Sequence, residues 1–211
     1  MPPEVAADWE DRTGSRVCIF YGSMDAGQLS VGSPSDPREK RHHTVGRPHD
    51  CCEAMITAEG EICMRGDTVQ ARYWGEEFGP HSEDGWVHMG DLGRLDEDGY
   101  LEVLGRTKDL VIRGGTNINP HEVERAIRLH PGVADVCVVG KPDRELGERA
   151  VAFVVPRNPA RPPDLAALKT FLETQGMARY KWPEEVRLVA EIPLSGPGKV
   201  DRRALEGLLV T

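Results

Sequence analysis

The sequence predicts a mixed fold, α+β with α/β-like alternation in its second half, in a chain of 211 residues. Between residues 60 and 104, short apolar stretches alternate with Gly and Asp turns, which is typical of a small antiparallel β unit. After residue 105, apolar strand patterns alternate with helix patterns, which indicates a separate α+β domain. We therefore expect two domains, residues 1–106 and residues 107–211.

The first elements in this prediction are a helix, a strand and a long loop. A helix pattern ends at Gly14, and residues 17–21 predict a short apolar strand. The strand runs into a polar loop flanked by Gly22 and Gly27, and strand ends of this kind bind ligands in parallel α/β sheets. Residues 30–53 are rich in Pro, Ser, Asp and His and predict a loop.

The middle of the chain predicts short strands, with Asp98-Gly99 as a hairpin turn. Gly90 and Asp91 lie between two of these strands, so Asp91 is either an ordinary turn residue or a carboxylate presented to a ligand. The predicted strands are residues 61–64, 86–89, 92–95 and 100–104.

Residues 105–124 predict a turn, a short strand, a corner of two glycines and a capped helix. The corner, Gly114-Gly115, can adopt backbone angles that are closed to residues with a Cβ. Spacing alone makes this stretch a surface corner. Its helix start carries three capping signals, namely Asn119, Pro120 and Glu122.

The rest of the second half predicts a compact α+β domain of about a hundred residues, a usual domain size. Its predicted helices are residues 120–130 and 164–173 and a last helix that starts at Asp201, and its predicted strands are residues 133–139, 151–155 and 186–189.

A glycine loop, residues 195–201, precedes the last helix. It differs from a nucleotide P-loop because Val200 follows the Gly-Lys pair and Pro193 stands where another glycine is required. What remains is Lys199 at the tip of a loop, ahead of a helix N-terminus that favours anions. Lys199 is therefore either a solvated surface lysine or a functional cation.

The charge balance excludes several classes of partner. The 26 Lys and Arg against 35 Asp and Glu leave a net charge of −9, which argues against a nucleic-acid surface and against general attraction to anionic lipid. We find neither a signal-peptide pattern nor the roughly 20 consecutive apolar residues of a membrane span.

The cysteines indicate a reducing compartment. Five cysteines at irregular spacing do not predict a disulfide framework, so we expect a cytoplasmic protein. A zinc site is an alternative to a simple polar loop, although adjacent cysteines are poorly placed to chelate one tetrahedral ion. The residues that such a site would use are His42, His43, His49, Cys51 and Cys52.

Several short segments, taken together, resemble the C-terminal part of the AMP-forming adenylating enzymes, which include acyl- and aryl-CoA synthetases and related adenylation domains. Each segment is weakly specific alone, but their joint order and spacing cover nearly the whole chain. Residues 105–124 look most like acid–CoA ligases. The matching segments are residues 21–25, 44–48, 60–66, 85–92, 105–124 and 193–202.

The resemblance implies two half-reactions: a small carboxylic acid attacks the α-phosphate of ATP to give acyl-AMP and pyrophosphate, and the thiol of CoA then displaces AMP. By position, Tyr21 would stack on adenine, while Asp91 and Arg106 would bind the ribose of ATP or AMP. Asp25 would help to hold Mg²⁺. Lys199 would be the catalytic lysine that bridges the substrate carboxylate and the phosphate.

The resemblance also implies two domains with different roles. Residues 1–106 would be the β-rich C-terminal end of a large N-terminal AMP-binding domain, and residues 107–211 a complete, small, mobile domain. Lys108 would be the hinge about which the small domain swings between the half-reactions. The corner that would line the CoA (pantetheine) channel consists of Gly114, Gly115, Thr116 and Asn117.

The chain departs from the family at a few positions. Met24 and Met89 stand where the family usually carries threonine, and Asp25 replaces a glutamate. The Ser/Thr/Gly-rich phosphate loop of the family does not occur in these residues, so we expect a missing N-terminal segment or a homo-oligomer as partner, and no pyrophosphate exchange by this chain alone. The alternative hypothesis is a non-catalytic remnant that serves as a binding or interaction module.

Overall fold

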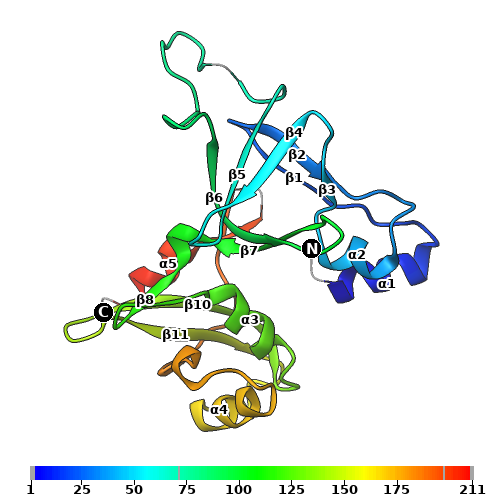
Figure 1. Ribbon diagram of the computed structural model, residues 1–211. Helices are drawn as coiled ribbons and strands as arrows, with labels where there is room; N and C mark the ends of the chain where they lie inside the picture. Colours follow the sequence, from blue (N-terminus) through cyan, green and yellow to red (C-terminus); the bar gives the residue numbers. More distant parts are fainter. Residues whose placement is uncertain (1–2, 71, 197, 210–211) are drawn as a thin grey trace. The chain divides into compact units, whose positions relative to one another are not determined.

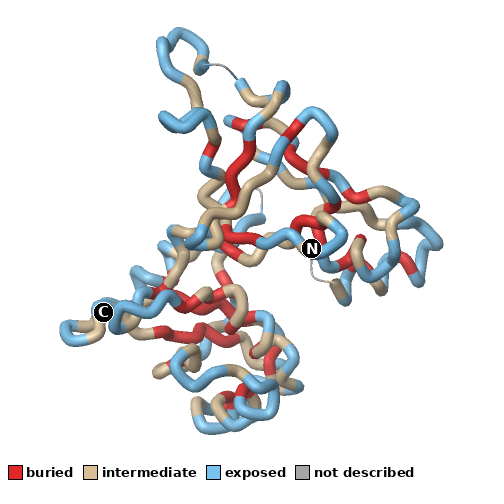
Figure 2. Tube along the Cα trace, viewed as in Figure 1, coloured by how far each residue is buried: buried red, intermediate tan, exposed pale blue. Residues whose placement is uncertain are grey.

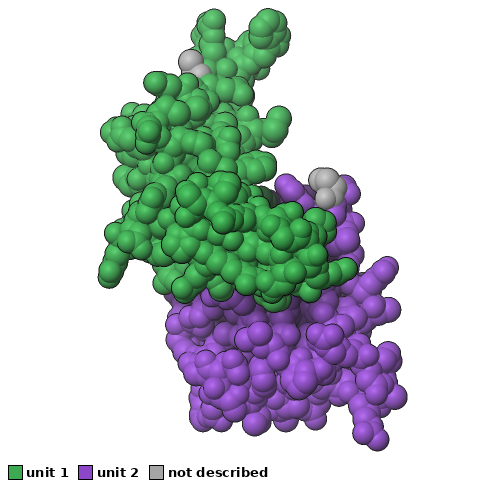
Figure 3. Space-filling model, turned by 90° about the vertical axis from the view of Figure 1, so that its right-hand side faces the viewer, with its two compact units in different colours: residues 1–107 green, residues 108–211 purple. Residues whose placement is uncertain are grey.

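The computed structural model describes residues 3–70, 72–196 and 198–209. The chain divides into two compact units, residues 1–107 (unit 1) and residues 108–211 (unit 2), which Figure 3 shows in separate colours. The boundary drawn from the sequence, between residues 106 and 107, lies one residue earlier. Both units mix helices with mainly antiparallel sheets, so the predicted α+β class is confirmed.

The described residues of unit 1 form two antiparallel sheets and two helices (Figure 1). Its helices are α1 (Pro3–Thr13) and α2 (Arg38–His43). The first sheet has the order β1 (Phe20–Ser23), β2 (Gly27–Val31), β3 (Arg47–Pro48). The second has the order β4 (Cys52–Ile56), β5 (Glu61–Gly66), β6 (Val87–Leu95), β7 (Leu101–Arg106).

The core of unit 1 draws on both sheets. Leu29 of β2, Ile62 and Met64 of β5, and Leu101 of β7 are fully buried and belong to one cluster. In Figure 2, β5 is the longest buried stretch of this unit. Burial of apolar side chains of this size stabilises each by about 1.5–3 kcal/mol, and it fixes the sheet that carries the candidate site.

Unit 2 is a sheet covered by helices on both faces. A turn of 3₁₀ helix, Thr107–Asp109, leads into it from unit 1. The strand order is β10, β11, β8, β9, and β12 pairs in parallel with β11. The strands and helices are β8 (Val111–Arg113), β9 (Thr116–Ile118), α3 (Pro120–Arg128), β10 (Val133–Asp143), β11 (Gly147–Pro156), α4 (Leu165–Thr174), a 3₁₀ turn (Arg179–Lys181), β12 (Glu185–Leu188), β13 (Leu194–Ser195), β14 (Lys199–Val200) and α5 (Arg202–Gly207).

The period of two in β10 and β11 explains why both faces of this sheet are covered. Val136 and Val138 of β10 lie in one buried cluster with residues of α3 and α4. Cys137 and Val139, which point to the other face, lie in a second cluster with Leu205 of α5. Residues 136–139 of β10 are apolar at every position, and such a segment is buried on both faces only between two layers. In unit 2, helices α3 and α4 form one layer and α5 the other.

The prediction of a loop over residues 30–53 is wrong. This segment contains the end of β2, helix α2, strand β3 and the start of β4. The helix is held by a charge pair that no local pattern reveals: Arg41 donates to both carboxylate oxygens of Glu10 in α1, at 2.8 and 3.0 Å. This contact holds the pKa of Glu10 at about 2.

Two further predictions for unit 1 are corrected. The strands predicted at residues 86–89 and 92–95 are parts of one strand, β6, which begins at Val87, rather than two strands with a turn between them. The loop after Tyr21 is a hairpin turn between antiparallel β1 and β2, so it is not the end of a strand in a parallel sheet. The pairing of β6 with β5 and β7, and of β1 with β2, decides both structures, and residue type alone does not specify such pairing.

The corner at Gly114-Gly115 is a tight hairpin between β8 and β9, and the sequence missed the second of these strands. Both glycines have positive φ, 56° and 79°, as a two-residue hairpin turn requires. The helix after it begins as predicted: the side chain of Asn119 accepts from the backbone N–H of His121, and Pro120 is the first helical residue.

Candidate functional site

Three of the sequence-predicted site residues meet in unit 1. The phenol of Tyr21 in β1 donates to Asp91 Oδ2 at 2.8 Å, and Arg106 Nε lies 3.3 Å from Asp91 Oδ1. Asp91 and Arg106 are directly opposite each other in the β6–β7 ladder, so the pairing of two strands creates the ion pair. The Asp91 side chain is 16% exposed and Arg106 is 46% exposed.

The electrostatics of this group favour a neutral phenol next to a carboxylate. Burial, and then the hydrogen bond to Asp91, raise the pKa of Tyr21 above its usual value. Each carboxylate oxygen of Asp91 has one protein partner and a further lone pair, so Asp91 can still accept from a ligand that carries hydroxyl groups. A polar carboxylate next to an aromatic ring suits a nucleoside, with a diol on one side and a flat base on the other.

The predicted metal residue lies at the turn between β1 and β2. Asp25 is exposed there, in the turn Met24–Ala26, and Met24 beside it is 91% exposed. A single exposed carboxylate matches the way proteins hold Mg²⁺, which keeps most of its water and binds substrate phosphates. Met89, the other departure from the family pattern, packs against the buried core of unit 1.

The residues predicted to line a CoA channel form the tip of the β8–β9 hairpin. Gly114, Gly115, Thr116 and Asn117 are all exposed. The backbone N–H of Gly114 donates to the carbonyl of Leu146 at 2.7 Å, which fixes the hairpin against the β10–β11 turn. The hairpin tip is therefore held in place, and its two glycines present no side chain to a ligand that approaches it.

The predicted hinge residue, Lys108, is exposed in the middle of the 3₁₀ turn Thr107–Asp109. The next residue, Asp109, is anchored in unit 2: Arg202 Nε lies 3.2 Å from Asp109 Oδ2, and Arg202 Nη2 is 2.8 Å from Glu124 Oε1. His121 bridges the two carboxylates, and these contacts raise its pKa, with the hydrogen bond to Asp109 as the largest cause. The chain is thus fixed immediately after Lys108.

Lys199 lies in a small hairpin rather than at the tip of an open loop. It pairs with Ser195 across β13 and β14, and Pro197 of this segment lies outside the described residues. Lys199 is exposed, and its ammonium group forms no ion pair with the residues that the structure describes. Asp201 caps α5 directly behind the hairpin by accepting from the N–H of Ala204 at 3.1 Å.

The group of potential metal ligands that the structure brings together differs from the His and Cys residues considered in the sequence. Within residues 3–70, 72–196 and 198–209, the group near enough to share one ion is Glu61, Cys63 and His88. Its members already bond one another and the backbone: His88 Nδ1 lies 2.9 Å from Glu61 Oε2, and the other Glu61 oxygen accepts from the N–H of Gly90. Burial raises the pKa of the Cys63 thiol to about 11, which disfavours the thiolate that a metal would need.

The His and Cys residues of positions 42–52 do not form such a group among the described residues. His42 is buried in α2, where its Nε2 lies 3.1 Å from Glu10 Oε2. Glu61 and His88 are site residues that the sequence reasoning missed, although the strand period already placed Glu61 and Cys63 on one face of β5.

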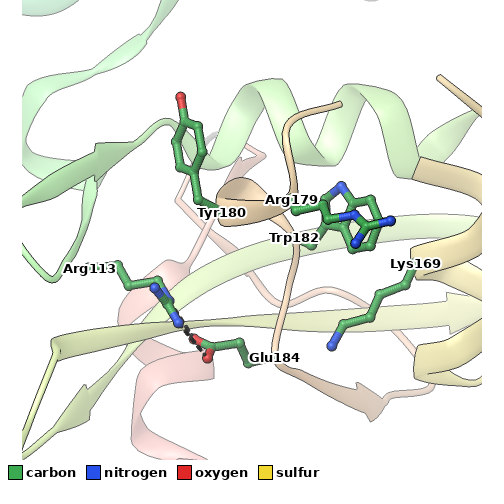
Figure 4. Close-up of a pocket in the computed structure, with 6 residues that line it drawn as sticks. All are labelled: Arg113, Lys169, Arg179, Tyr180, Trp182 and Glu184. Carbon is green, nitrogen blue, oxygen red and sulfur yellow. Dashed lines mark hydrogen bonds and ion pairs between the residues drawn. The ribbon is translucent and has the colours of Figure 1, made fainter. Parts of the chain in front are cut away.

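A pocket of about 340 Å³ lies on unit 2 (Figure 4). Arg113 reaches into it from β8 and donates to both carboxylate oxygens of Glu184 at 3.0 Å. The guanidinium of Arg179 lies over the ring of Trp182, 5.6 Å from its centre. With Lys169 and Tyr180 completing the lining, the pocket combines three cations and one carboxylate with two aromatic rings, an excess of positive charge that suits a ligand with a phosphate and a flat ring.

Among the described residues, no helix is long and apolar enough to cross a membrane.

Comparisons with known proteins identify the relatives of this chain. Residues 122–199 match the family model of the AMP-binding enzyme C-terminal domain. The chain is 37% identical over 220 residues to the sulfoacetate–CoA ligase of Cupriavidus necator. This alignment covers 97% of the present chain and 42% of the ligase. It is also 37% identical over 196 residues to the 2,3-dihydroxybenzoate–AMP ligase of Bacillus subtilis. This alignment covers 86% of the present chain and 36% of that ligase.

The fold has a close match among solved structures. The crystal structure of ATP-bound MatB from Rhodopseudomonas palustris superimposes with a TM-score of 0.87 at 30% sequence identity, over 98% of this chain and 43% of that one. The chain thus spans about two fifths of the length of these proteins.

Proposed function

We propose that the chain forms part of an acid–CoA ligase, because it belongs to the AMP-forming adenylating enzymes as a C-terminal part of that family. Its reaction is the ATP-dependent activation of a small carboxylic acid to acyl-AMP, followed by formation of the CoA thioester. The observation that carries the proposal is the grouping of Tyr21, Asp91 and Arg106 in unit 1, together with Lys199 on unit 2, which is exposed and has no ion-pair partner among the described residues.

In the first half-reaction, a carboxylate oxygen of the acid attacks the α-phosphorus of ATP, and the bond to the β-phosphate oxygen breaks to release pyrophosphate. Asp91 accepts from the ribose hydroxyls, Arg106 lies beside the same sugar, and Tyr21 stacks on the adenine. These contacts orient ATP before the reaction, which removes part of its entropic barrier. Asp25 would hold Mg²⁺, which neutralises phosphate charge when it is bound.

Lys199 supplies the positive charge for this step. Two anions, the acid and the α-phosphate, must approach each other, and a positioned cation lowers the barrier by an electrostatic contribution. Because Lys199 has no ion-pair partner among the described residues, its charge is available without breaking an existing contact.

In the second half-reaction, the thiolate of CoA attacks the acyl carbon and AMP leaves. We assign Lys108 as the hinge that reorients unit 2 between the steps, and the tip Gly114–Asn117 as the lining of the pantetheine channel. Three features support this assignment: the exposed Lys108 at the unit boundary, the anchored Asp109 behind it and the two-glycine turn of the hairpin. The cationic pocket of unit 2 suits the phosphorylated end of the same ligand.

The test is ATP–pyrophosphate exchange with a panel of carboxylic acids, measured on the natural polypeptide that carries this chain. We expect acid-dependent exchange that is lost in Lys199→Ala, and thioester formation when CoA is added. Arg203→Ala is the matched control. It removes an exposed positive charge from helix α5, which follows the hairpin that carries Lys199. Absence of exchange with every acid would favour the non-catalytic binding module, and exchange without thioester would indicate another acyl acceptor.

A further inference from the structure

Strand β6 carries a bulge that consists of Met89, Gly90 and Asp91. On the β5 side, Cys63 pairs with His88 and Glu61 pairs with Leu92, so one residue of β5 faces three of β6. The middle residue of the bulge, Gly90, has a φ of 69°, in the region that favours glycine. The peptide groups of the bulge are therefore out of step with the ladder on this side.

Two side chains take the place of the missing ladder bonds at Gly90. Glu61 Oε1 accepts from the Gly90 N–H at 3.1 Å. Thr107 Oγ1 donates to the Gly90 carbonyl oxygen at 2.7 Å. Both backbone polar groups of Gly90 are thus satisfied by side chains, and each of those side chains comes from a different element.

Glu61 is itself held in place. Its second carboxylate oxygen accepts from His88 Nδ1 at 2.9 Å, so the carboxylate spans a side chain and a backbone group of the same strand. A carboxylate that accepts two hydrogen bonds in this way has little rotational freedom, and bonds to a charged acceptor are the stronger kind.

The residue after Gly90 is Asp91. Its two oxygens lie against Tyr21 and Arg106, which fix the direction of the carboxylate but not the position of its backbone. That position is set by the pairing of Asp91 with Arg106 in β7 and by the Gly90 peptide, which Glu61 and Thr107 hold. A shift of one ångström there would move the carboxylate away from a bound sugar.

We propose that Glu61 and Thr107 are positioning residues that hold the β6 bulge, so that Asp91 presents its carboxylate to the ribose hydroxyls of ATP. The inference rests on the proposed function of Asp91. It adds a link that the function alone does not contain: Thr107 is the residue before the hinge Lys108, so one hydrogen bond joins the end of unit 1 to the nucleotide site.

The test compares ATP with 2′,3′-dideoxy-ATP in the natural polypeptide that carries this chain. Thr107→Val keeps the shape and removes the donor, and Glu61→Ala removes both bonds of the carboxylate. We expect the KM for ATP to rise about fivefold and about tenfold respectively, the scale of one neutral and one charged hydrogen bond, with a smaller change in kcat. With dideoxy-ATP the rise should nearly disappear, because Asp91 has no sugar hydroxyl to hold.

Conservative variants separate positioning from folding. Thr107→Ser keeps the hydroxyl, and Glu61→Gln keeps an acceptor for Gly90 and a donor for a neutral His88, so both should restore a KM close to that of the unchanged protein. Equal losses with both nucleotides, or no rescue by Ser and Gln, would overturn the proposal. Asp91→Ala tests the underlying function separately: if it affects ATP and dideoxy-ATP alike, the ribose role of Asp91 is wrong, whatever Glu61 and Thr107 do.

Discussion

Asp91 and Lys199 stand for two opposite ways of presenting a charge. Asp91 lies in the nine-residue strand β6, 16% exposed, with protein partners on both carboxylate oxygens. Lys199 lies in the two-residue strand β14, exposed and without an ion pair among the described residues. The difference suits two tasks: a group that binds a nucleotide throughout a reaction gains from being fixed, whereas a cation needed in one step gains from being able to leave.

The largest expected effect comes from removing the exposed charge of Lys199. Lys199→Ala should lower the rate of acyl-AMP formation by about a hundredfold or more, the scale of one lost electrostatic stabiliser. Thioester formation from supplied acyl-AMP should be unchanged, and so should the unfolding temperature, since Lys199 is exposed. The measurements are single-turnover rates of each half-reaction, and equal loss of both would show that Lys199 does not act in adenylation alone.

The second effect tests whether mobility is needed. Lys108→Pro fixes φ near −65° at the exposed centre of the 3₁₀ turn and should block rotation there. We expect thioester formation to fall by about a hundredfold, with adenylation reduced much less, because a hinge must absorb large backbone changes.

Lys108→Ala is the control for the hinge variant, since it removes the side chain and leaves the backbone free. It should support both half-reactions. If Lys108→Ala loses thioester formation to the same extent as Lys108→Pro, the side chain is what matters and the hinge assignment is wrong. If neither variant loses it, rotation at residue 108 is not required, and the assignment is wrong as well.

The third effect concerns the fixed charge. Asp91→Asn keeps the shape of the side chain but removes the ion pair with Arg106 and weakens acceptance from a diol. The KM for ATP should rise about tenfold, the scale of a hydrogen bond to a charged group. Initial rates over a range of ATP concentrations measure it, and an unchanged KM would remove Asp91 from the nucleotide site.

Local signals explain which parts of the fold were predictable. The three N-caps Asn119, Asp164 and Asp201 each accept a backbone N–H within their own first turn, so a few adjacent residues determine where α3, α4 and α5 begin. Runs of apolar residues likewise identified β10 and β11. The two-domain order follows from the change in pattern near residue 105.

The parts that failed depend on contacts between distant residues. Helix α2 exists beside Glu10, about thirty positions earlier, and the bulge in β6 exists beside Glu61, about thirty positions earlier as well. The candidate site divides in the same way. A motif placed Asp91 and Arg106 in the sequence, but only strand register shows that they face each other, and no local pattern reveals Glu61 and Thr107 around Gly90.

A smaller effect tests the glycine hairpin. Gly115 has a φ of 79° and open space where a Cβ would stand, so Gly115→Ala adds backbone strain of about 1–2 kcal/mol without a clash. Urea unfolding should show this loss. Gly176→Ala is a matched control elsewhere in unit 2, with a φ of 72° and equally open surroundings. If Gly115 also lines the CoA channel, only Gly115→Ala should raise the KM for CoA.

The smallest expected effect is a pH dependence in the contacts that anchor Asp109, the residue after the proposed hinge. Hydrogen bonds to Asp109 and Glu124 raise the pKa of His121, so its protonated form stabilises unit 2 fully below its ordinary value of 6.5. This contribution is lost as the pH rises through the elevated pKa. The pKa values of Asp109 and Glu124 are lowered, and their contribution is lost instead as the pH falls below their ordinary values of 3.8 and 4.5.

The anchor should therefore be strongest between about pH 5 and pH 6.5. Trp182 is the only tryptophan in residues 108–211, so its fluorescence, with the other tryptophans replaced by phenylalanine, follows the unfolding of unit 2 alone. His121→Gln should flatten the decline above pH 6.5 and leave the acid limb in place, because Arg202 still holds both carboxylates. An unchanged decline above pH 6.5 in the variant would show that another group titrates there. In that case the segment after the hinge is held by Arg202 without help from the histidine, and its rigidity would not depend on pH in this range.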